Sequence, residues 1–230
     1  MRRAHASAVV VAAGAGSRLG AGEPKALLEI GGRAMVSVAV GAVVSCTAIE
    51  EVVVAAPPGF EGAVAAAVAG LGSAIRVVPG GPTRQASVAA ALAAVDPEAQ
   101  IVVVHDAARP FASSGLFEAV VDTVASGADA AIPLLQLTDT VKRVRNGEVV
   151  GTEPRDELGL AQTPQGARAG VLRNALEQAA VARVEFTDDA ALLEWAGATV
   201  RVVPGEAGNF KITTLLDLLR ADELLGGGRG

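Results

Sequence analysis

The chain has 230 residues, of which 51% are hydrophobic, and its formal net charge is −6 at pH 7. This length suits one large domain with a sizeable buried core and argues against two full domains. The negative charge and the lack of a basic run argue against a general nucleic-acid surface, because binding to phosphate backbones depends on clustered lysine and arginine. A small anionic ligand is compatible with this composition, because it needs only a local cationic pocket.

The mean hydropathy of +0.43 raises the question of a membrane span. The longest uncharged run, residues 34–49, is interrupted by polar residues and is shorter than the roughly 20 apolar residues that a span requires. We expect a buried helix there. The basic start of the chain runs directly into a glycine-rich loop and offers no separate cleavable segment, so we expect a cytoplasmic protein. The single cysteine, Cys46, excludes an intramolecular disulfide and a cysteine-based zinc site.

Apolar runs rich in β-branched residues alternate with stretches of helical character. The predicted strands are residues 8–12, 52–56, 75–78, 101–105, 130–134 and 200–203. The predicted helices are residues 34–45, 60–69, 84–94, 116–126, 168–180, 188–195 and 214–225. This alternation predicts an α/β fold of Rossmann-like type, with a mostly parallel sheet and helices on both faces.

The first predicted strand leads into a glycine-rich loop that contains Gly14 and Gly16 and is followed by Arg18 and Lys25. Glycines let backbone N–H groups approach phosphate oxygens, and the two cations can neutralise the charge of those oxygens. A dinucleotide-binding loop would need glycine where Leu19 stands, and no Walker A sequence occurs. The pattern favours a triphosphate site. The alternative is an ordinary strand-to-helix turn with solvated charges.

A second group of polar residues follows the strand at 101–105. Asp106 can hold Mg²⁺ against triphosphate oxygens, although it could instead cap the following turn. Arg109, within one turn of it, is suited to a bidentate contact with the phosphate of a second substrate. We expect His105 to be packed or hydrogen-bonded and not catalytic. Ligands of parallel sheets bind at the carboxyl ends of the strands, where this group and the glycine-rich loop would meet.

Residues 137–157 form a charged segment in which Asn146-Gly147 lies between two alternating runs. Asn-Gly in this setting is a strong signal for a β-hairpin. Such a hairpin has little core of its own, so we expect a projecting arm that clasps a second subunit in a homodimer. The alternative is a solvated surface flap. The whole chain, 1–230, is predicted to be a single domain carrying this arm.

The sequence offers no nucleophile and base pair of the kind that hydrolases use. Transfer of a nucleotidyl group to a phosphate acceptor needs none, because a phosphomonoester has a second pKa of about 6 and is largely dianionic at neutral pH. The protein must align the acceptor with the α-phosphate and stabilise charge on the leaving pyrophosphate. We expect Arg18, Lys25, Mg²⁺ on Asp106 and a further cation, Lys211, to do this.

Seven segments in order along the chain closely resemble the 2-C-methyl-D-erythritol 4-phosphate cytidylyltransferases of the non-mevalonate isoprenoid pathway. These segments are the glycine-rich loop with Pro24-Lys25, GGPTRQASV at 80–88, VHDAARP at 104–110, DTVK at 139–142, QTPQ at 162–165, TDDA at 187–190 and NFKIT at 209–213. No cyclase domain follows in this sequence, so we expect the monofunctional form.

The resemblance implies transfer of CMP from CTP to methylerythritol phosphate, and roles for individual residues. The residues that would bind the nucleotide are Ala13, Gly14, Ala15, Gly16, Gly81 and Ser87. The residues that would act on the α-phosphate are Arg18, Lys25 and Lys211. The residues that would form the methylerythritol phosphate site are Asp106, Arg109, Thr140, Arg155, Thr163 and Thr187, with Lys211 nearby. In this family the residue matching Arg155 reaches the neighbouring subunit's site from the arm.

One position departs from the resemblance. Relatives often place an acidic or polar residue after the second glycine near the cytosine, whereas this chain has Pro82, which offers neither a side-chain acceptor nor an N–H donor. Base recognition would then depend more on Gly81 and Ser87. Two alternatives stay open at this point: a cytidylyltransferase of the same type acting on ribitol 5-phosphate, and a nucleotide-binding module without catalysis whose arm mediates assembly.

Overall fold

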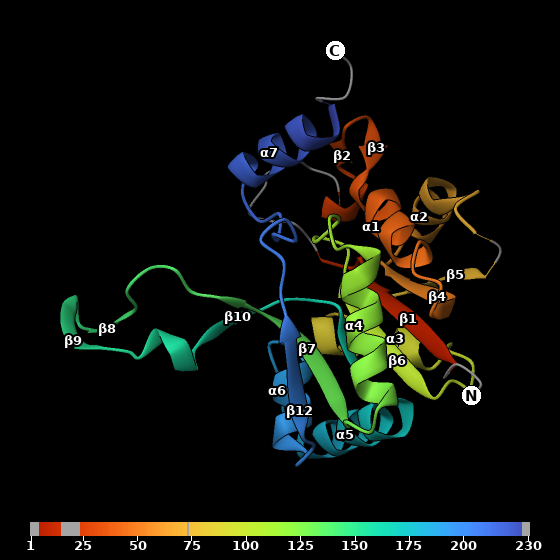
Figure 1. Ribbon diagram of the computed structural model, residues 1–230. Coiled ribbons are helices and arrows are strands. Elements are labelled where there is room, and N and C mark those ends of the chain that lie inside the picture. Colours follow the sequence, from red (N-terminus) through yellow and green to blue (C-terminus); the bar gives the residue numbers. More distant parts are fainter. Residues whose placement is uncertain (1–4, 15–23, 73, 227–230) are drawn as a thin grey trace.

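The fold is a mixed β-sheet covered by helices on both faces (Figure 1). The computed structural model describes residues 5–14, 24–72 and 74–226. The strands of the main sheet are β1 (Ala6–Val11), β4 (Ile49–Ala56), β5 (Ile75–Pro79), β6 (Ile101–Asp106), β7 (Ala130–Gln136), β10 (Gly159–Ala161), β11 (Gln165–Arg168) and β12 (Val200–Pro204). Their order is β10-β7-β11-β6-β1-β4-β5, with β12 also paired to β7.

The predicted strands form a parallel sheet, as expected. Strands β6, β1, β4 and β5 are mutually parallel, and β12 is parallel to β7. The helices are α1 (Met35–Val44), α2 (Glu61–Val68), α3 (Arg84–Leu92), α4 (Ser114–Ala125), α5 (Ala169–Ala182), α6 (Asp189–Trp195) and α7 (Leu215–Gly226), with short 3-10 turns η2 (Lys25–Leu27) and η3 (Arg155–Glu157). Each predicted strand and helix is confirmed to within a few residues at its ends.

Alternate residues of each central strand belong to two different hydrophobic cores. Along β1, Ala8 and Val10 pack with α1, α2 and α4, whereas Val9 packs with α3, α5 and α6. Side chains of successive strand residues point to opposite faces, so a continuous apolar strand supplies both cores. The prediction of helices on both faces is therefore confirmed.

Two antiparallel strands, β10 and β11, were not predicted. Strand β11 lies between β6 and β7 and is antiparallel to both. It is short and contains Gln165 and Gly166, so it lacks the β-branched alternation that marks a strand in sequence. A Cβ on Gly166 would lie 2.5 Å from Val120 of α4, so glycine is needed for this close approach of helix and strand. Pairing on both sides makes β11 a strand.

The charged hairpin is present and projects from the body of the molecule (Figure 1). Strands β8 (Lys142–Arg145) and β9 (Glu148–Thr152) form a two-stranded antiparallel sheet. Asn146 and Gly147 connect them with φ values of 51° and 83°, the conformation that favours Asn-Gly in a tight hairpin turn. Every residue of β8 is exposed.

Among the described residues, no helix combines the length and apolar character needed to cross a membrane. The apolar run at 34–49 forms α1, seven of whose ten residues are buried.

Helix α7 begins with a capping box that also fixes the preceding segment. Asp217 Oδ2 accepts hydrogen bonds of 2.8–2.9 Å from the backbone N–H and hydroxyl groups of Thr213 and Thr214, and Thr214 Oγ1 accepts from the Asp217 N–H at 3.2 Å. Burial acts to raise the pKa of Asp217, but these hydrogen bonds outweigh it and lower that pKa to about 2. The capping box therefore anchors the segment that carries Lys211.

We predict that Asp217→Asn lowers the free energy of unfolding by about 1 kcal/mol at pH 7, as loss of a helix cap does. The pKa of the folded state lies below that of the unfolded state, so the stabilisation is present above about pH 4 and is lost as the pH falls towards about 2. Urea unfolding at pH 7, 5 and 3 should show the difference from wild type shrinking at the lowest pH. The control is Glu223→Gln, an exposed residue of the same helix. A difference that is constant with pH would contradict this account.

Candidate functional site

A pocket of about 400 Å³ lies at the carboxyl ends of β1, β5 and β6. Val11 and Asp106 are register partners in adjacent parallel strands, so the loops that follow them leave the sheet at the same edge. The predicted site residues that line this pocket are Ala13, Gly14, Lys25, Gly81, Ser87, Asp106 and Lys211. These residues come from distant parts of the sequence, and the fold brings them together.

Two glycines after β5 allow the pocket wall to form. A Cβ on Gly80 would lie 2.5 Å from the Cβ of Ala13, and one on Gly81 would lie 2.5 Å from the Cβ of Ala86. Ser87 Oγ accepts a hydrogen bond from the Gly81 N–H at 3.1 Å and lies 2.8 Å from the Thr83 carbonyl oxygen, to which it can donate. These hydrogen bonds fix the loop between β5 and α3 on the first turn of α3.

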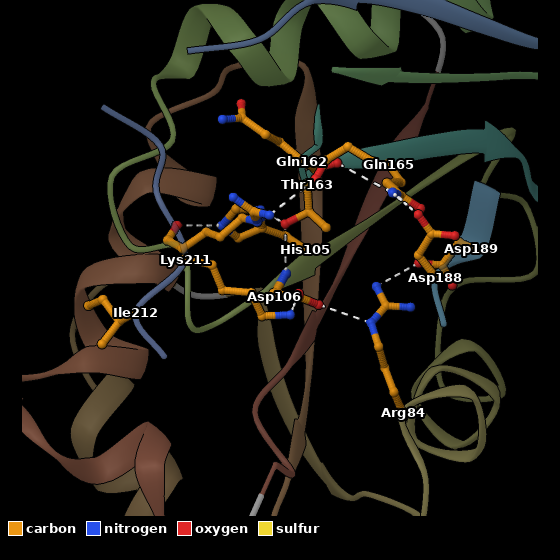
Figure 2. Close-up of polar contacts among 12 residues, drawn as sticks. Arg84, His105, Asp106, Gln162, Thr163, Gln165, Asp188, Asp189, Lys211 and Ile212 are labelled. Carbon is orange, nitrogen blue, oxygen red and sulfur yellow. Dashed lines mark hydrogen bonds and ion pairs between the residues drawn. The ribbon is translucent and has the colours of Figure 1, made fainter. Parts of the chain in front are cut away.

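Asp106, the last residue of β6, is the charged centre of the pocket (Figure 2). Its Oδ1 pairs with Arg84 Nε at 3.0 Å and its Oδ2 with Lys211 Nζ at 2.7 Å. Burial alone would raise the pKa of Asp106, but the two cations hold it well below its usual range. Asp106 is therefore ionised and accepts hydrogen bonds on both oxygens.

Arg84 was assigned no role in the sequence analysis, although it belongs to a segment that carries the family resemblance. Its guanidinium also pairs with Asp189 at 2.7 Å, so it joins the end of β6 to the start of α6. Burial acts to lower the pKa of Arg84, but both carboxylates raise it above its usual range. A sequence signal existed: a cation at the first position of a helix opposes the helix dipole and so needs an acidic partner.

His105 is buried and serves the architecture of the site (Figure 2). Thr163 Oγ1 accepts from the Asp106 N–H at 3.0 Å and lies 3.0 Å from His105 Nδ1, while His105 Nε2 lies 3.0 Å from the Arg109 carbonyl oxygen. This network assigns the ring proton to Nε2. Burial lowers the pKa of His105 to about 4, so the ring is neutral at pH 7. The expectation that His105 is packed and hydrogen-bonded is confirmed.

Arg109 is not among the residues that line this pocket. Its guanidinium donates to the backbone carbonyl oxygens of Asn209 at 2.8 Å and Ala161 at 3.2 Å. Its Nε is buried without a hydrogen-bond partner among the described residues. Burial lowers the pKa of Arg109, and Asp106 partly opposes this. Arg109 thus holds together the segments around Asp106.

The two predicted catalytic lysines that the structure describes line one pocket. Lys25, in η2, donates from Nζ to the carbonyl oxygen of Ile212. The Ile212 N–H in turn donates to the Ala108 carbonyl oxygen at 2.8 Å, and the Ile212 side chain is buried with Ile30. These contacts hold the segment with Lys211 against the turn with Lys25.

The remaining predicted residues fall elsewhere. Ala15, Gly16 and Arg18 lie outside the described residues. Thr187 is exposed just before α6, and Thr140 and Arg155 lie on or beside the projecting hairpin. Within one chain, none of these last three lines the pocket.

The described part of the chain contains no cluster of three or more His, Cys, Asp or Glu side chains suited to a metal ion. Asp106 is the acid among the described residues that line the pocket.

Comparison with known proteins identifies the family. A family model described as 2-C-methyl-D-erythritol 4-phosphate cytidylyltransferase matches residues 6–227. A protein of that name from Saccharopolyspora erythraea is 45% identical over 222 residues, which cover 95% of this chain and 98% of that protein. A bifunctional IspD/IspF enzyme from Clavibacter michiganensis is 47% identical over 222 residues, but the chain spans only 53% of its length.

A solved structure agrees with the sequence comparisons. The crystal structure of 2-C-methyl-D-erythritol 4-phosphate cytidylyltransferase from Thermus thermophilus has a TM-score of 0.80 and 39% sequence identity, and the match covers 96% of this chain and 98% of that one. On this evidence, the chain belongs to the 2-C-methyl-D-erythritol 4-phosphate cytidylyltransferase family.

Proposed function

We propose that this chain transfers CMP from CTP to 2-C-methyl-D-erythritol 4-phosphate and so yields 4-diphosphocytidyl-2-C-methyl-D-erythritol and pyrophosphate. The observation that carries the proposal is the pocket in which Lys25, Lys211 and Asp106 meet at the carboxyl edge of the sheet, in a chain that the family model matches from residue 6 to residue 227. A pocket with cations from separate segments suits a ligand that carries several phosphates.

The nucleotide would occupy the part of the pocket formed by the loops after β1 and β5. The backbone of Gly14 and Gly81 borders it, and the Gly80 and Gly81 positions leave no room for a side chain. Ser87 and Gly81 are already fixed by hydrogen bonds, so the base would meet a preformed wall. Pro82 lines the same wall and contributes shape without a side-chain hydrogen bond.

The reaction is a substitution at the α-phosphorus of CTP. An oxygen of the acceptor phosphate attacks in line, a new P–O bond forms, and the bond to the β-phosphate oxygen breaks as pyrophosphate leaves with the electron pair. Lys25 and Lys211 stabilise the charge on the transferring and departing groups, and Arg18 has the same predicted role. No protein base is required, because the acceptor phosphate is already an anion.

Asp106 would bind the acceptor, because an ionised carboxylate accepts hydrogen bonds from the hydroxyl groups of a polyol phosphate. Arg109 and Thr163 hold the backbone around it, and Thr187 would contribute from the exposed segment just before α6.

We propose a divalent cation, Mg²⁺ or a similar ion, as the cofactor. When bound, it supplies neutralisation of the triphosphate charge. Each Asp106 oxygen pairs with one cation and keeps a second lone pair, so Asp106 could supply one ligand to such an ion, with phosphate oxygens and water supplying the others.

We further propose a homodimer in which the hairpin of one subunit completes the site of the other. Thr140 and Arg155 lie on a projecting, exposed segment, where they cannot line the pocket of a compact monomer. Arg155 donates to the Thr138 carbonyl oxygen at 2.7 Å, which fixes it to the base of the hairpin. The cytoplasmic location stays a prediction from the sequence.

The first test is release of pyrophosphate by the purified protein with CTP and Mg²⁺. We expect release with methylerythritol phosphate, little release with ribitol 5-phosphate, and little when UTP or ATP replaces CTP. Preference for ribitol 5-phosphate would assign the enzyme to that acceptor. Absence of pyrophosphate release with every combination of nucleotide and acceptor would contradict the proposed catalysis.

Replacement of Lys25 tests its role at the α-phosphate. Lys25→Ala should lower kcat by about 10²- to 10³-fold, as loss of a group that stabilises transition-state charge does. Thermal unfolding of the variant should shift only slightly, because the hydrogen bond lost is the one from Lys25 to the Ile212 carbonyl oxygen. Arg201→Ala removes an exposed cation of β12 that does not line the pocket, and its kcat should be unchanged. Equal losses in the two variants would contradict a specific role for Lys25.

Mixed dimers test the contribution of the hairpin. Lys25→Ala and Arg155→Ala subunits, each inactive alone, are co-expressed with different tags. If Arg155 acts on the neighbouring subunit, each mixed dimer contains one intact site, and random pairing of equal amounts restores about one quarter of wild-type activity. If Arg155 acts within its own subunit, no site is intact and activity is not restored. Purification by both tags in succession separates the two cases further, because pure mixed dimers should show about one half of wild-type activity if Arg155 acts across subunits and none if it does not.

A further inference from the structure

Arg84 occupies an unfavourable electrostatic position. It is the first residue of α3, whose N-cap Thr83 accepts a hydrogen bond from the Ala86 N–H at 3.2 Å. A cation at a helix N-terminus lies at the positive end of the helix dipole. The side chain of Arg84 is nevertheless only 22% exposed. Other groups must hold it there.

Two acids from separate elements hold the Arg84 guanidinium (Figure 2). Nε pairs with Asp106 at the end of β6, and one terminal nitrogen pairs with Asp189, the first residue of α6. The Asp189 side chain is 4% exposed and that of Asp106 is 10% exposed. Charge-assisted hydrogen bonds at two points of a planar group fix both its place and its orientation.

Lys211 is held in a different way. Among the residues that the structure describes, it makes one ion pair, with the second oxygen of Asp106, and its side chain is 42% exposed. A lysine ammonium is a compact charge on a flexible stem, so it can turn from Asp106 to a phosphate oxygen in the same pocket. If Arg84 were absent, that movement would leave a buried carboxylate without a cation, which is costly.

We propose that the Arg84–Asp189 ion pair is a positioning device for Asp106. It keeps that carboxylate directed at the acceptor substrate and keeps Arg84 away from the triphosphate, so that Lys211 is the cation that exchanges between Asp106 and substrate phosphate. Arg84 is thus a positioning residue, and Asp189 is its anchor. The inference rests on the proposed function of Asp106 in acceptor binding.

The decisive variant is Asp189→Asn, which removes the anchoring charge and preserves the size of the side chain. Arg84 is then free to turn into the pocket that it lines. Pyrophosphate with Mg²⁺ should bind at least about threefold more tightly in titration calorimetry, because a cation is added to its site. The KM for methylerythritol phosphate should rise by about tenfold, because Asp106 loses its fixed partner. A general loss of structure would instead weaken the binding of pyrophosphate as well as that of the acceptor.

The matched control is Asp188→Asn, the same change one residue earlier. Asp188 caps α6 by accepting from the Ala191 N–H at 2.9 Å, and it accepts from Gln165 at 3.0 Å. Asp188 lies at the same end of the same helix, but in the described part of the chain the ion pairs of Arg84 are with Asp106 and Asp189. Its pyrophosphate affinity and acceptor KM should stay at wild-type values.

Variants of Arg84 itself distinguish positioning from direct phosphate binding. Arg84→Gln should raise the KM for the acceptor by about tenfold and that for CTP by less than about threefold. Arg84→Lys keeps the charge but lacks the planar guanidinium with its several N–H donors. Its KM for the acceptor should lie between those of wild type and Arg84→Gln. Unfolding midpoints measured in parallel identify any variant that fails to fold, and Asp189→Asn then carries the test.

Weaker pyrophosphate binding in Asp189→Asn would overturn the proposal, as would parallel changes in the KM of both substrates. A larger effect of Arg84→Gln on the KM for CTP would make Arg84 a phosphate ligand instead. Failure of the proposed function is a separate outcome, because the wild-type protein would then release no pyrophosphate from CTP and methylerythritol phosphate.

Discussion

The structure of the site depends on keeping one carboxylate charged at the edge of a hydrophobic sheet. Asp106 ends β6, whose six residues are all buried, and an unpaired charge in such surroundings is costly. Two cations supply the compensation, and they come from the N-terminus of α3 and from the segment before α7. The placement of both elements is therefore coupled to the ionisation of a single side chain, and the pocket forms between them.

A network of buried hydrogen bonds supports the ion pairs of Asp106. The chain of contacts from the Asp106 N–H through Thr163 and His105 to the Arg109 carbonyl oxygen satisfies buried groups that would otherwise be unpaired. Fully paired buried networks fix side chains and backbone in one arrangement. Transfer between two phosphates needs such rigidity, because the reacting atoms must be aligned in line and the catalytic charges placed in advance. His105 contributes as a neutral hydrogen-bonding group.

Much of the fold was readable from local patterns. Apolar runs such as those of β1 and β6 marked the buried parallel strands, and Asn146-Gly147 marked the hairpin, because turn conformation and strand burial are imposed by neighbouring residues in sequence. Strand β11 was not predicted, because its own residues lack a strand pattern and it is a strand only through its pairing with β6 and β7 on either side. Helix starts were predicted to within two residues whether a side-chain cap was present, as at Asp188 before α6 and Ser113 before α4, or absent, as before α1.

The sequence by itself determined the family, the mostly parallel sheet, the hairpin and the cations and acid of the pocket, because residue type and spacing encode local conformation and available charge. Only the tertiary structure decided which charges meet. Arg84, Asp106, Asp189 and Lys211 are separated by up to 127 positions, yet they form one connected set of ion pairs. Sequence spacing carries no information on such contacts, because they arise where separate elements converge at one edge of the sheet.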